Sequence, residues 1–163
     1  MKPSSQDPVA EFLRSSKAAR RVGTNQTCAC GEHRPKALNA GSNPMTCESC
    51  KRQKEGKRIT DHHHVAGRAN SPETIPVFVN DHRAILSVAQ YQWPPETLRN
   101  PHGNPLLRAS ACIRGFTDTL YYLIDKFLLW IPEFLETLNA FLTKKLGPNW
   151  WADTELEKFK SEH

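Results

Sequence analysis

Residues 59–90 read ITDHHHVAGRANSPETIPVFVNDHRAILSVAQ, and this stretch decides the fold of the middle of the chain. Two β-prone runs, 59–65 and 74–79, predict two strands joined by a loop that contains Gly and Pro. Residues 81–90 then predict a helix, which Asn80 opens as its N-cap. We therefore expect this stretch to fold as strand, strand, helix.

Upstream of these elements, the cysteines form two short pairs. Residues 24–60 contain many Gly, Pro and Asn residues and show almost no apolar periodicity, so we expect no hydrophobic core there. The pairs are C-x-C and, sixteen residues later, C-x-x-C, and thiolates are the soft anionic donors that hold Zn²⁺ in structural sites. The spacing therefore predicts a zinc-ribbon-like knuckle over residues 24–58, with His33 as an alternative ligand. Its four predicted ligands are Cys28, Cys30, Cys47 and Cys50.

The last third of the chain is strongly helical in pattern. Over residues 106–163 the apolar residues recur mostly at steps of three and four. Pro132 either kinks this helix or lies in the first turn of a second one, and Gly147 with Pro148 ends the run. We expect the apolar stripe to form the core, with Cys112 as a small core residue; the alternative is a surface for a partner or for a homodimer.

The remaining segments flank these regions. Residues 1–23 predict a polar basic arm with a short helix from Pro8 to Arg21, and residues 93–105 predict a Pro-rich connector. The chain as a whole is therefore expected to have an α+β fold. It would consist of a zinc-bound loop region, a strand–strand–helix core at 59–92 and a C-terminal helical pair.

Length and charge limit the classes of function. The chain has 163 residues with a formal net charge of +5, and 38% of its residues are apolar. Residues 1–60 hold 12 Lys and Arg against 5 Asp and Glu, whereas residues 101–163 hold 7 against 8. A basic front and a nearly neutral back predict that the front meets a polyanion, while the back supplies a core or a partner surface.

The sequence carries no recognisable signal for secretion or for membrane insertion. Its first twenty residues lack an apolar segment, and the longest apolar run, 120–131, is interrupted by Asp125 and Lys126. That run is also shorter than the ~20 residues of a membrane-spanning helix. We therefore expect a cytoplasmic protein without membrane contact, where reducing conditions favour metal binding by paired cysteines.

Histidines gather at the end of the first predicted strand and near the start of the predicted helix. An acid and three imidazoles are consecutive at 61–64, and His82 follows eighteen residues after His64. This order brings imidazoles from two elements together around one metal ion. In a regular strand His62 and His64 share a face, so only an irregular strand end lets His63 and His64 serve one site.

The runs HHVAG (63–67) and TIPVFVNDHR (74–83) resemble the ββα-metal core of HNH endonucleases. The resemblance covers about residues 45–90, and the further runs C-x-C-G-E, WPPETLRNP and IRG are similar to those of a group of small HNH-type proteins. It implies that His63 is the first metal ligand, His64 the general base and His82 the helix-borne ligand. His62 is the alternative first ligand.

The resemblance also implies a middle Asn that orients the base, and by spacing this role falls near Thr74. Asn70 and Asn80 are the nearby alternatives. Asp61 is expected to orient a ligand imidazole from behind.

The implied activity is metal-dependent hydrolysis of DNA phosphodiester bonds. The catalytic ion would be Mg²⁺, or else Mn²⁺, Ni²⁺ or Zn²⁺, with a separate structural Zn²⁺ in the knuckle. A non-catalytic zinc-dependent nucleic-acid-binding module and a metal-stabilised interaction adaptor are the alternatives. The residues expected to contact the phosphate backbone are Lys51, Arg52, Lys57, Arg58, Arg68 and Arg83.

Overall fold

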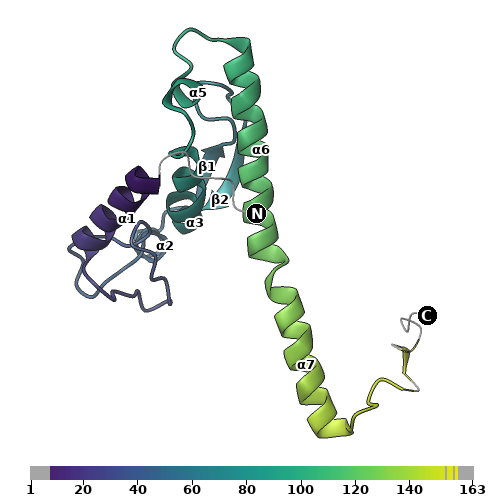
Figure 1. Ribbon diagram of the computed structural model, residues 1–163. Coiled ribbons are helices and arrows are strands. Elements are labelled where there is room, and N and C mark those ends of the chain that lie inside the picture. The colour runs from purple at the N-terminus through teal and green to yellow at the C-terminus, as the bar shows by residue number, and fades with distance from the viewer. Residues whose placement is uncertain (1–7, 153, 156, 158–163) are drawn as a thin grey trace. The chain divides into compact units, whose positions relative to one another are not determined.

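The computed structural model describes residues 8–152, 154–155 and 157. The chain divides into two compact units after Tyr122 (Figure 1). Its elements in order are α1 (Pro8–Val22), α2 (Glu48–Lys54), β1 (Thr60–His64), β2 (Thr74–Phe78), α3 (Val79–Asp81), the π-helical turn η1 (His82–Leu86), α4 (Ser87–Gln90), α5 (Pro95–Arg99), α6 (Pro105–Phe127) and α7 (Trp130–Leu146). The α+β class is confirmed, with one small sheet and several helices.

Strands β1 and β2 form an antiparallel hairpin that lies within one residue of the predicted bounds. In its register His63 is opposite Ile75 and His64 is opposite Thr74. Side chains alternate along a strand, so His63 is buried on one face while His62 and His64 lie on the other.

The helix after the hairpin is continuous from α3 through η1 to α4. The prediction that Asn80 is its N-cap is wrong, because the helix begins at Val79 and Asn80 lies inside it. The Asn80 side chain is held by tertiary contacts instead: its Oδ1 accepts the Ser49 backbone N–H at 3.0 Å, and its Nδ2 donates to Glu32 at 3.1 Å. The Asn80 side chain therefore bonds to residues of the knuckle region instead of capping the helix.

The first unit is packed around three small apolar clusters instead of one large core. One cluster lies between α1 and the cysteine loops, so residues 24–58 do have a small apolar centre that we did not expect. The second joins the β1 end to α5 and α6, and the third joins β2 to the helix at 79–90 and α6. Their buried members are Val22, Cys28, Leu38 and Cys47; Ala66, Trp93 and Ala111; and Val77, Leu86 and Tyr122.

Helix α6 runs alongside the hairpin and packs through its small residues (Figure 1). At Gly115 an added Cβ would lie 1.8 Å from the Val65 carbonyl oxygen, so the two backbones are in direct contact. Within the first unit the apolar stripe of this helix does not join the buried clusters, since Ile113 and Phe116 are exposed there, and its burial against another surface stays a prediction. Cys112 is also exposed and is no core residue.

The segment 93–105 is more than a connector. It contains α5, and it buries Trp93, Thr97 and Asn100. The Trp93 indole N–H donates to Asp118 of α6 at 2.9 Å, which ties this segment to the helix.

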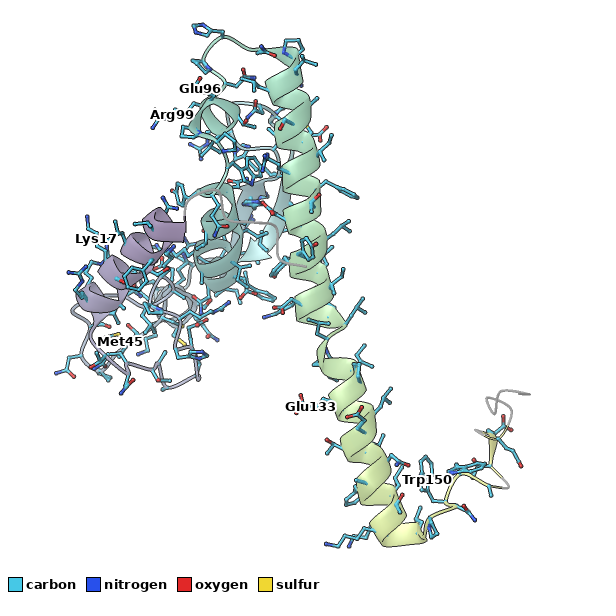
Figure 2. The ribbon with its side chains drawn as sticks, viewed as in Figure 1. Lys17, Met45, Glu96, Arg99, Glu133 and Trp150 are labelled. Carbon is cyan, nitrogen blue, oxygen red and sulfur yellow. The ribbon has the colours of Figure 1, made fainter. Side chains whose placement is uncertain are left out.

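In the second unit, α7 begins at Trp130, so Pro132 lies in the first turn, and the helix ends before Gly147 as predicted. The indole N–H of Trp150 donates to Asn139 of α7 at 3.0 Å, which places the following segment beside this helix (Figure 2). Among the described helices, none combines the length and the apolar character needed to cross a membrane.

Candidate metal centre and histidine site

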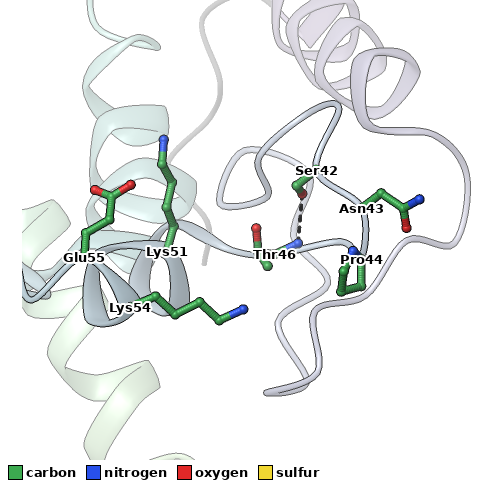
Figure 3. Close-up of a pocket in the computed structure, with 7 residues that line it drawn as sticks. All are labelled: Ser42, Asn43, Pro44, Thr46, Lys51, Lys54 and Glu55. Carbon is green, nitrogen blue, oxygen red and sulfur yellow. Dashed lines mark hydrogen bonds between the residues drawn. The ribbon is translucent and has the colours of Figure 1, made fainter.

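The two cysteine pairs are brought together by the loop between them. Leu38 pairs with Cys47 as an isolated bridge, and the Asn39 N–H donates to the Thr46 carbonyl at 2.9 Å. At the tip, the Ser42 hydroxyl accepts the Thr46 N–H at 3.0 Å (Figure 3). The loop therefore folds back on itself and delivers the second pair at the start of α2.

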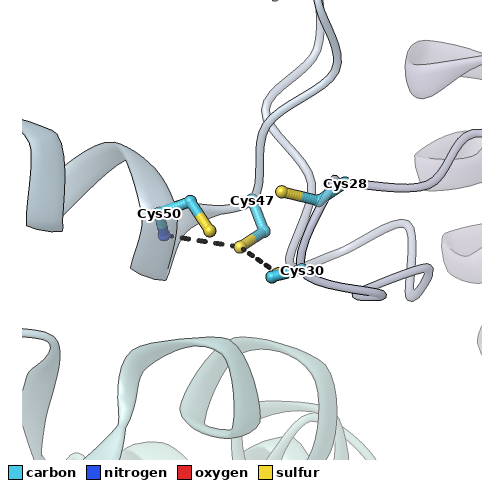
Figure 4. A group of neighbouring side chains, drawn as sticks. All are labelled: Cys28, Cys30, Cys47 and Cys50. Carbon is cyan, nitrogen blue, oxygen red and sulfur yellow. Dashed lines mark hydrogen bonds between the residues drawn. The ribbon is translucent and has the colours of Figure 1, made fainter.

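The four predicted ligands converge as expected. The sulfur atoms of Cys28, Cys30, Cys47 and Cys50 all lie within 4.8 Å of one another (Figure 4). Cys47 is the N-cap of α2, and its sulfur accepts the Cys50 backbone N–H at 3.4 Å. N–H···S bonds of this kind stabilise a thiolate, and the cluster could hold a metal ion such as Zn²⁺.

The pKa values of the cysteines are consistent with a cluster that ionises when it binds a cation. Burial alone would raise the pKa of Cys28, but hydrogen bonds from the backbone of Cys30 and Cys47 outweigh it and lower the pKa to about 6. The neighbouring Cys30 thiol raises the pKa of Cys50, and burial adds to that. Four thiolates this close repel one another, so a bound cation is what would allow all four to ionise.

The histidine site lies where β1 faces the helix at 79–90. The rings of His63 and His82 meet edge to face with centroids 5.2 Å apart. The His82 Nδ1 lies 3.3 Å from the Asp61 carboxylate, and a carboxylate only accepts, so His82 donates from Nδ1 and keeps a lone pair on Nε2. Asp61 therefore orients His82 from behind, as the sequence predicted.

His63 is 2% exposed and is electrically neutral near pH 7. Burial lowers its pKa to about 4, and repulsion from His82 and His64 acts in the same direction. The Gln90 amide, which donates to His64 O at 2.6 Å, also lies 3.3 Å from His63 Nε2. The amide nitrogen has two hydrogens, and the His64 and Val65 carbonyls accept from it at 2.6 and 3.2 Å, so Gln90 does not fix the tautomer of His63.

His64 lies on the opposite face of β1 from His63 and is half-buried. The pairing with β2 is regular up to His64, so the irregular strand end that would bring His63 and His64 to one site is not present in the hairpin. Its Nδ1 is 3.3 Å from the Ser71 carbonyl oxygen, which has no hydrogen to donate. The neutral ring therefore carries its proton on Nδ1 and a free lone pair on Nε2. This is the tautomer that a general base acting through Nε2 requires.

Thr74 does not take the role predicted for it. His62 and His64 are on one face of β1, and the Thr74 side chain is directed toward His62. Its hydroxyl lies 3.3 Å from His62 Nδ1. The hydrogen bond that orients His64 comes from Ser71 instead. Asn70 does not supply it either: its amide donates to the Thr97 carbonyl at 2.9 Å and its Oδ1 accepts from Asn100.

Two of the predicted phosphate contacts are ion-paired inside the protein. Arg52 donates to Asp61 at 2.6 Å and to Glu48 at 3.0 Å, and Arg83 donates to Glu48 at 3.0 Å. The Arg52 guanidinium thus reaches from α2 to the carboxylate that orients His82.

The other basic residues are more open. Lys57 makes an exposed pair with Glu55, whereas Lys51, Arg58 and Arg68 form no ion pair with carboxylates in the described part of the chain. Lys51 also lines an open hollow between α2 and the cysteine loop (Figure 3). The remaining lining residues are Ser42, Asn43, Pro44, Thr46, Lys54 and Glu55.

Sequence reasoning missed Gln90, Ser71 and Glu48. Gln90 acts through its side-chain amide, and Ser71 acts through its backbone carbonyl. Glu48 accepts hydrogen bonds from Arg52 and Arg83. The C-terminal end of the helix at 79–90 is the one signal that could have suggested Gln90, because it lies eight residues, or roughly two turns, after His82.

Within the described residues, the four cysteines are the group of three or more possible ligands whose donor atoms gather closely, and the imidazoles do not form a second such group. The chain matches no family model, no curated protein and no solved structure in the comparisons made. The function is therefore argued from the chemistry of the site.

Proposed function

We propose that the chain is a metal-dependent endonuclease of the HNH type, in which β1, β2 and the helix at 79–90 form a ββα-metal core that hydrolyses DNA phosphodiester bonds. The observation that carries the proposal is the His64 ring, whose Nδ1–H is held by Ser71 while its Nε2 keeps a free lone pair. His63 and His82, which face each other across the strand and the helix, add two further imidazoles.

The residues fit a divalent ion held by two imidazoles. His82 donates from Nδ1 to Asp61, which leaves Nε2 of this ring for an ion, and the neutral His63 ring faces it edge to face. The Gln90 amide lies 3.3 Å from His63 Nε2, so an ion bound through that nitrogen would replace this contact. Imidazole nitrogen suits Zn²⁺ or Ni²⁺ better than Mg²⁺, so we expect a transition ion to serve best. When bound, the ion would polarise the phosphoryl oxygens and stabilise the developing negative charge.

The chain's own residues supply the proton transfer and the substrate contact. His64 would take a proton from the attacking water on Nε2, because the Ser71 carbonyl accepts from Nδ1 and leaves Nε2 open. Since His64 faces away from His63 in the regular strand, this role requires the end of β1 to turn so that both imidazoles reach one phosphate. Arg68 is exposed and follows β1 closely, so it is the better of the two arginines for a phosphate, since Arg83 is paired with Glu48. Gln90 anchors the strand end that carries both histidines.

The test is nicking of supercoiled plasmid with Mg²⁺, Mn²⁺, Ni²⁺ or Zn²⁺ added. We expect His64→Ala to lower the rate by about 10²-fold or more, as removal of a general base does. His102→Ala is the matched control, because His102 is an exposed imidazole in the loop between α5 and α6. Activity that survives His64→Ala would remove the proposed role of that residue.

A second candidate is a nucleic-acid-binding module without turnover. Asn70 points to α5 instead of to His64, and Arg52 neutralises Asp61, so two features of an active site are otherwise engaged. Binding of DNA with no cleavage under any of these ions would favour this candidate. In both cases Lys51 and Arg58 would contact phosphate, and binding would weaken as salt rises.

A further inference from the structure

Helix α7 carries an apolar face that is open along its whole length. Six of its large apolar side chains are more than one third exposed, with Phe141 at 56%. They are Trp130, Phe134, Leu135, Leu138, Phe141 and Leu146. Their spacing places most of them on one side of the helix, which in a stable protein is covered by another surface.

The charges of α7 are divided between its two ends. Glu133 and Glu136 lie in the first half, Lys144 and Lys145 lie at the end, and the helix has no other charged residue (Glu133 is labelled in Figure 2). Its formal net charge is therefore zero, with about −2 at one end and +2 at the other. A helix of this kind is complementary to a copy of itself that runs in the opposite direction.

Orientation follows from this division. In an antiparallel pair, the acidic end of one helix lies beside the basic end of the other at both ends of the contact. In a parallel pair, acid would face acid and base would face base, which is unfavourable. The helix dipoles favour the antiparallel arrangement as well.

Other occupants fit less well. A helix that lies on a lipid surface has a polar face rich in Lys and Arg, and α7 carries as many Glu as Lys. A strongly charged protein partner would be attracted to one end of the helix and repelled by the other. A second copy satisfies both ends with the same surface, as a two-fold contact requires.

The face is long enough to carry a helix–helix contact. Seventeen residues span about 25 Å of helix. A specific dimer buries about 800 Å² on each partner, and an aromatic side chain can bury about 150–250 Å². Trp130, Phe134 and Phe141 are each about half exposed, so together they supply on the order of 300 Å², and the leucines of the face must supply much of the rest.

We propose that two copies of this chain associate through their α7 helices, packed antiparallel with Leu138 near the centre of the contact. The proposal does not depend on the nuclease activity. It gives the apolar residues of α7, which the second unit by itself leaves exposed, a surface to pack against.

The experiment measures the mass of the full chain by sedimentation at low salt. The wild type is expected to dimerise, and the double variants E133K/E136K and K144E/K145E are each expected to raise the dissociation constant about tenfold, because both ends then carry like charges. An equimolar mixture of the two variants is expected to restore association, since each end again meets its opposite. Circular dichroism of each variant checks that the helix is retained.

Leu138→Asp provides a second variant that leaves the charged ends unchanged and is expected to give a monomer. The proposal is overturned if the wild type stays monomeric at about 100 µM, or if both charge variants dimerise as tightly as the wild type. It is also overturned if the monomeric wild type instead binds vesicles of neutral or anionic lipid.

Discussion

The cysteine knuckle and the hairpin half of the first unit are neighbours, but different interactions hold them together. The knuckle has one small apolar cluster around Leu38, and its two ends meet at four thiols within 4.8 Å. The hairpin half is held by two clusters in which the turn after β1, strand β2 and the helices share buried side chains such as Trp93 and Leu86. The knuckle should therefore depend on a ligand for its stability, whereas the hairpin half should depend on packing.

Several polar contacts connect these halves, and two ion pairs join the contacts of Asn80 and Arg83 described above. Arg52 of α2 donates to Asp61 of β1, and Arg34 donates to Asp81 of α3 at 2.8 Å. Tyr122 of α6 donates to the other carboxylate oxygen of Asp81 at 3.1 Å. Loss of one half should therefore weaken the other without abolishing it, and four changes test this comparison.

The largest effect is expected from Cys47→Ser or from removal of bound metal by a chelator. Binding of structural Zn²⁺ contributes on the order of 10 kcal/mol to folding in small zinc domains, so residues 24–58 should unfold while the hairpin half persists. Limited proteolysis combined with metal analysis measures this. Cys112→Ser is the matched control, because Cys112 is exposed on α6 and should leave both metal content and protection unchanged. Equal protection of residues 24–58 in Cys47→Ser would contradict a ligand-dependent knuckle.

Gly115→Ala should be the most damaging small change in the hairpin half. The new Cβ would lie 1.8 Å from the Val65 carbonyl oxygen, so α6 must move away from the end of β1. Overpacking of this kind costs about 1–3 kcal/mol, and backbone contact favours the upper part of that range. Urea denaturation measures the loss, with Cys112→Ala on the exposed side of the same helix as the control. A loss below about 0.5 kcal/mol would show that the helix does not rest on β1 this closely.

These two changes also show what the sequence could predict. Residue type and spacing predict a possible metal site directly, and the sulfur atoms of the four cysteines gather as predicted. The strands were found from their composition, but helix packing was not: α6 was expected to bury Ile113 and Phe116, yet it packs through Gly115. Periodicity identifies the apolar face of a helix, but it does not reveal that a face of small residues lets two backbones come into contact.

The histidine site was predictable to a different degree. The contact between Asp61 and His82 follows from their residue types and their positions on strand and helix, and the structure has it at 3.3 Å, while metal binding by His82 stays a prediction. The orientation of His64 depends on a backbone carbonyl, which every residue has, so no sequence signal marks Ser71. Spacing predicts that Thr74 orients the His64 ring. It does not specify which of two histidines on one face the hydroxyl will reach, and the hydroxyl lies beside His62.

Arg52→Met should have an intermediate effect, because it breaks one bridge between the halves. The change keeps much of the side-chain length but leaves Glu48 and Asp61 without this partner, which costs about 1–3 kcal/mol for partly buried charges. Lys57→Met removes an exposed pair with Glu55 and should cost less than about 0.5 kcal/mol. Denaturation of the two variants side by side measures the difference, and equal stabilities would mean that the bridge at Asp61 contributes no more than a surface ion pair.

Tyr122→Phe should have the smallest effect, since it removes only a hydroxyl that donates to Asp81, and Asp81 keeps Arg34. One neutral donor to a charged acceptor contributes about 1–2 kcal/mol, which sets the expected loss of stability near neutral pH. Burial raises the pKa of Tyr122 to about 12, and the negative charge of Asp81 acts in the same direction.

The pH dependence of the free energy of unfolding distinguishes the hydrogen bond between Tyr122 and Asp81 from packing of the Tyr122 ring. Because the folded pKa of Tyr122 lies above its unfolded value of about 10, its contribution is complete below about pH 10 and is lost as pH rises toward 12. The stability advantage of the wild type over Tyr122→Phe should therefore shrink as pH rises through this window, because unfolding then releases a proton that the folded state retains. Urea denaturation of both proteins across the window measures the difference directly, and other titrating groups cancel in the comparison. A constant difference would mean that the phenol has the same proton affinity in both states, and that the Tyr122 hydroxyl does not hold Asp81 in the folded chain.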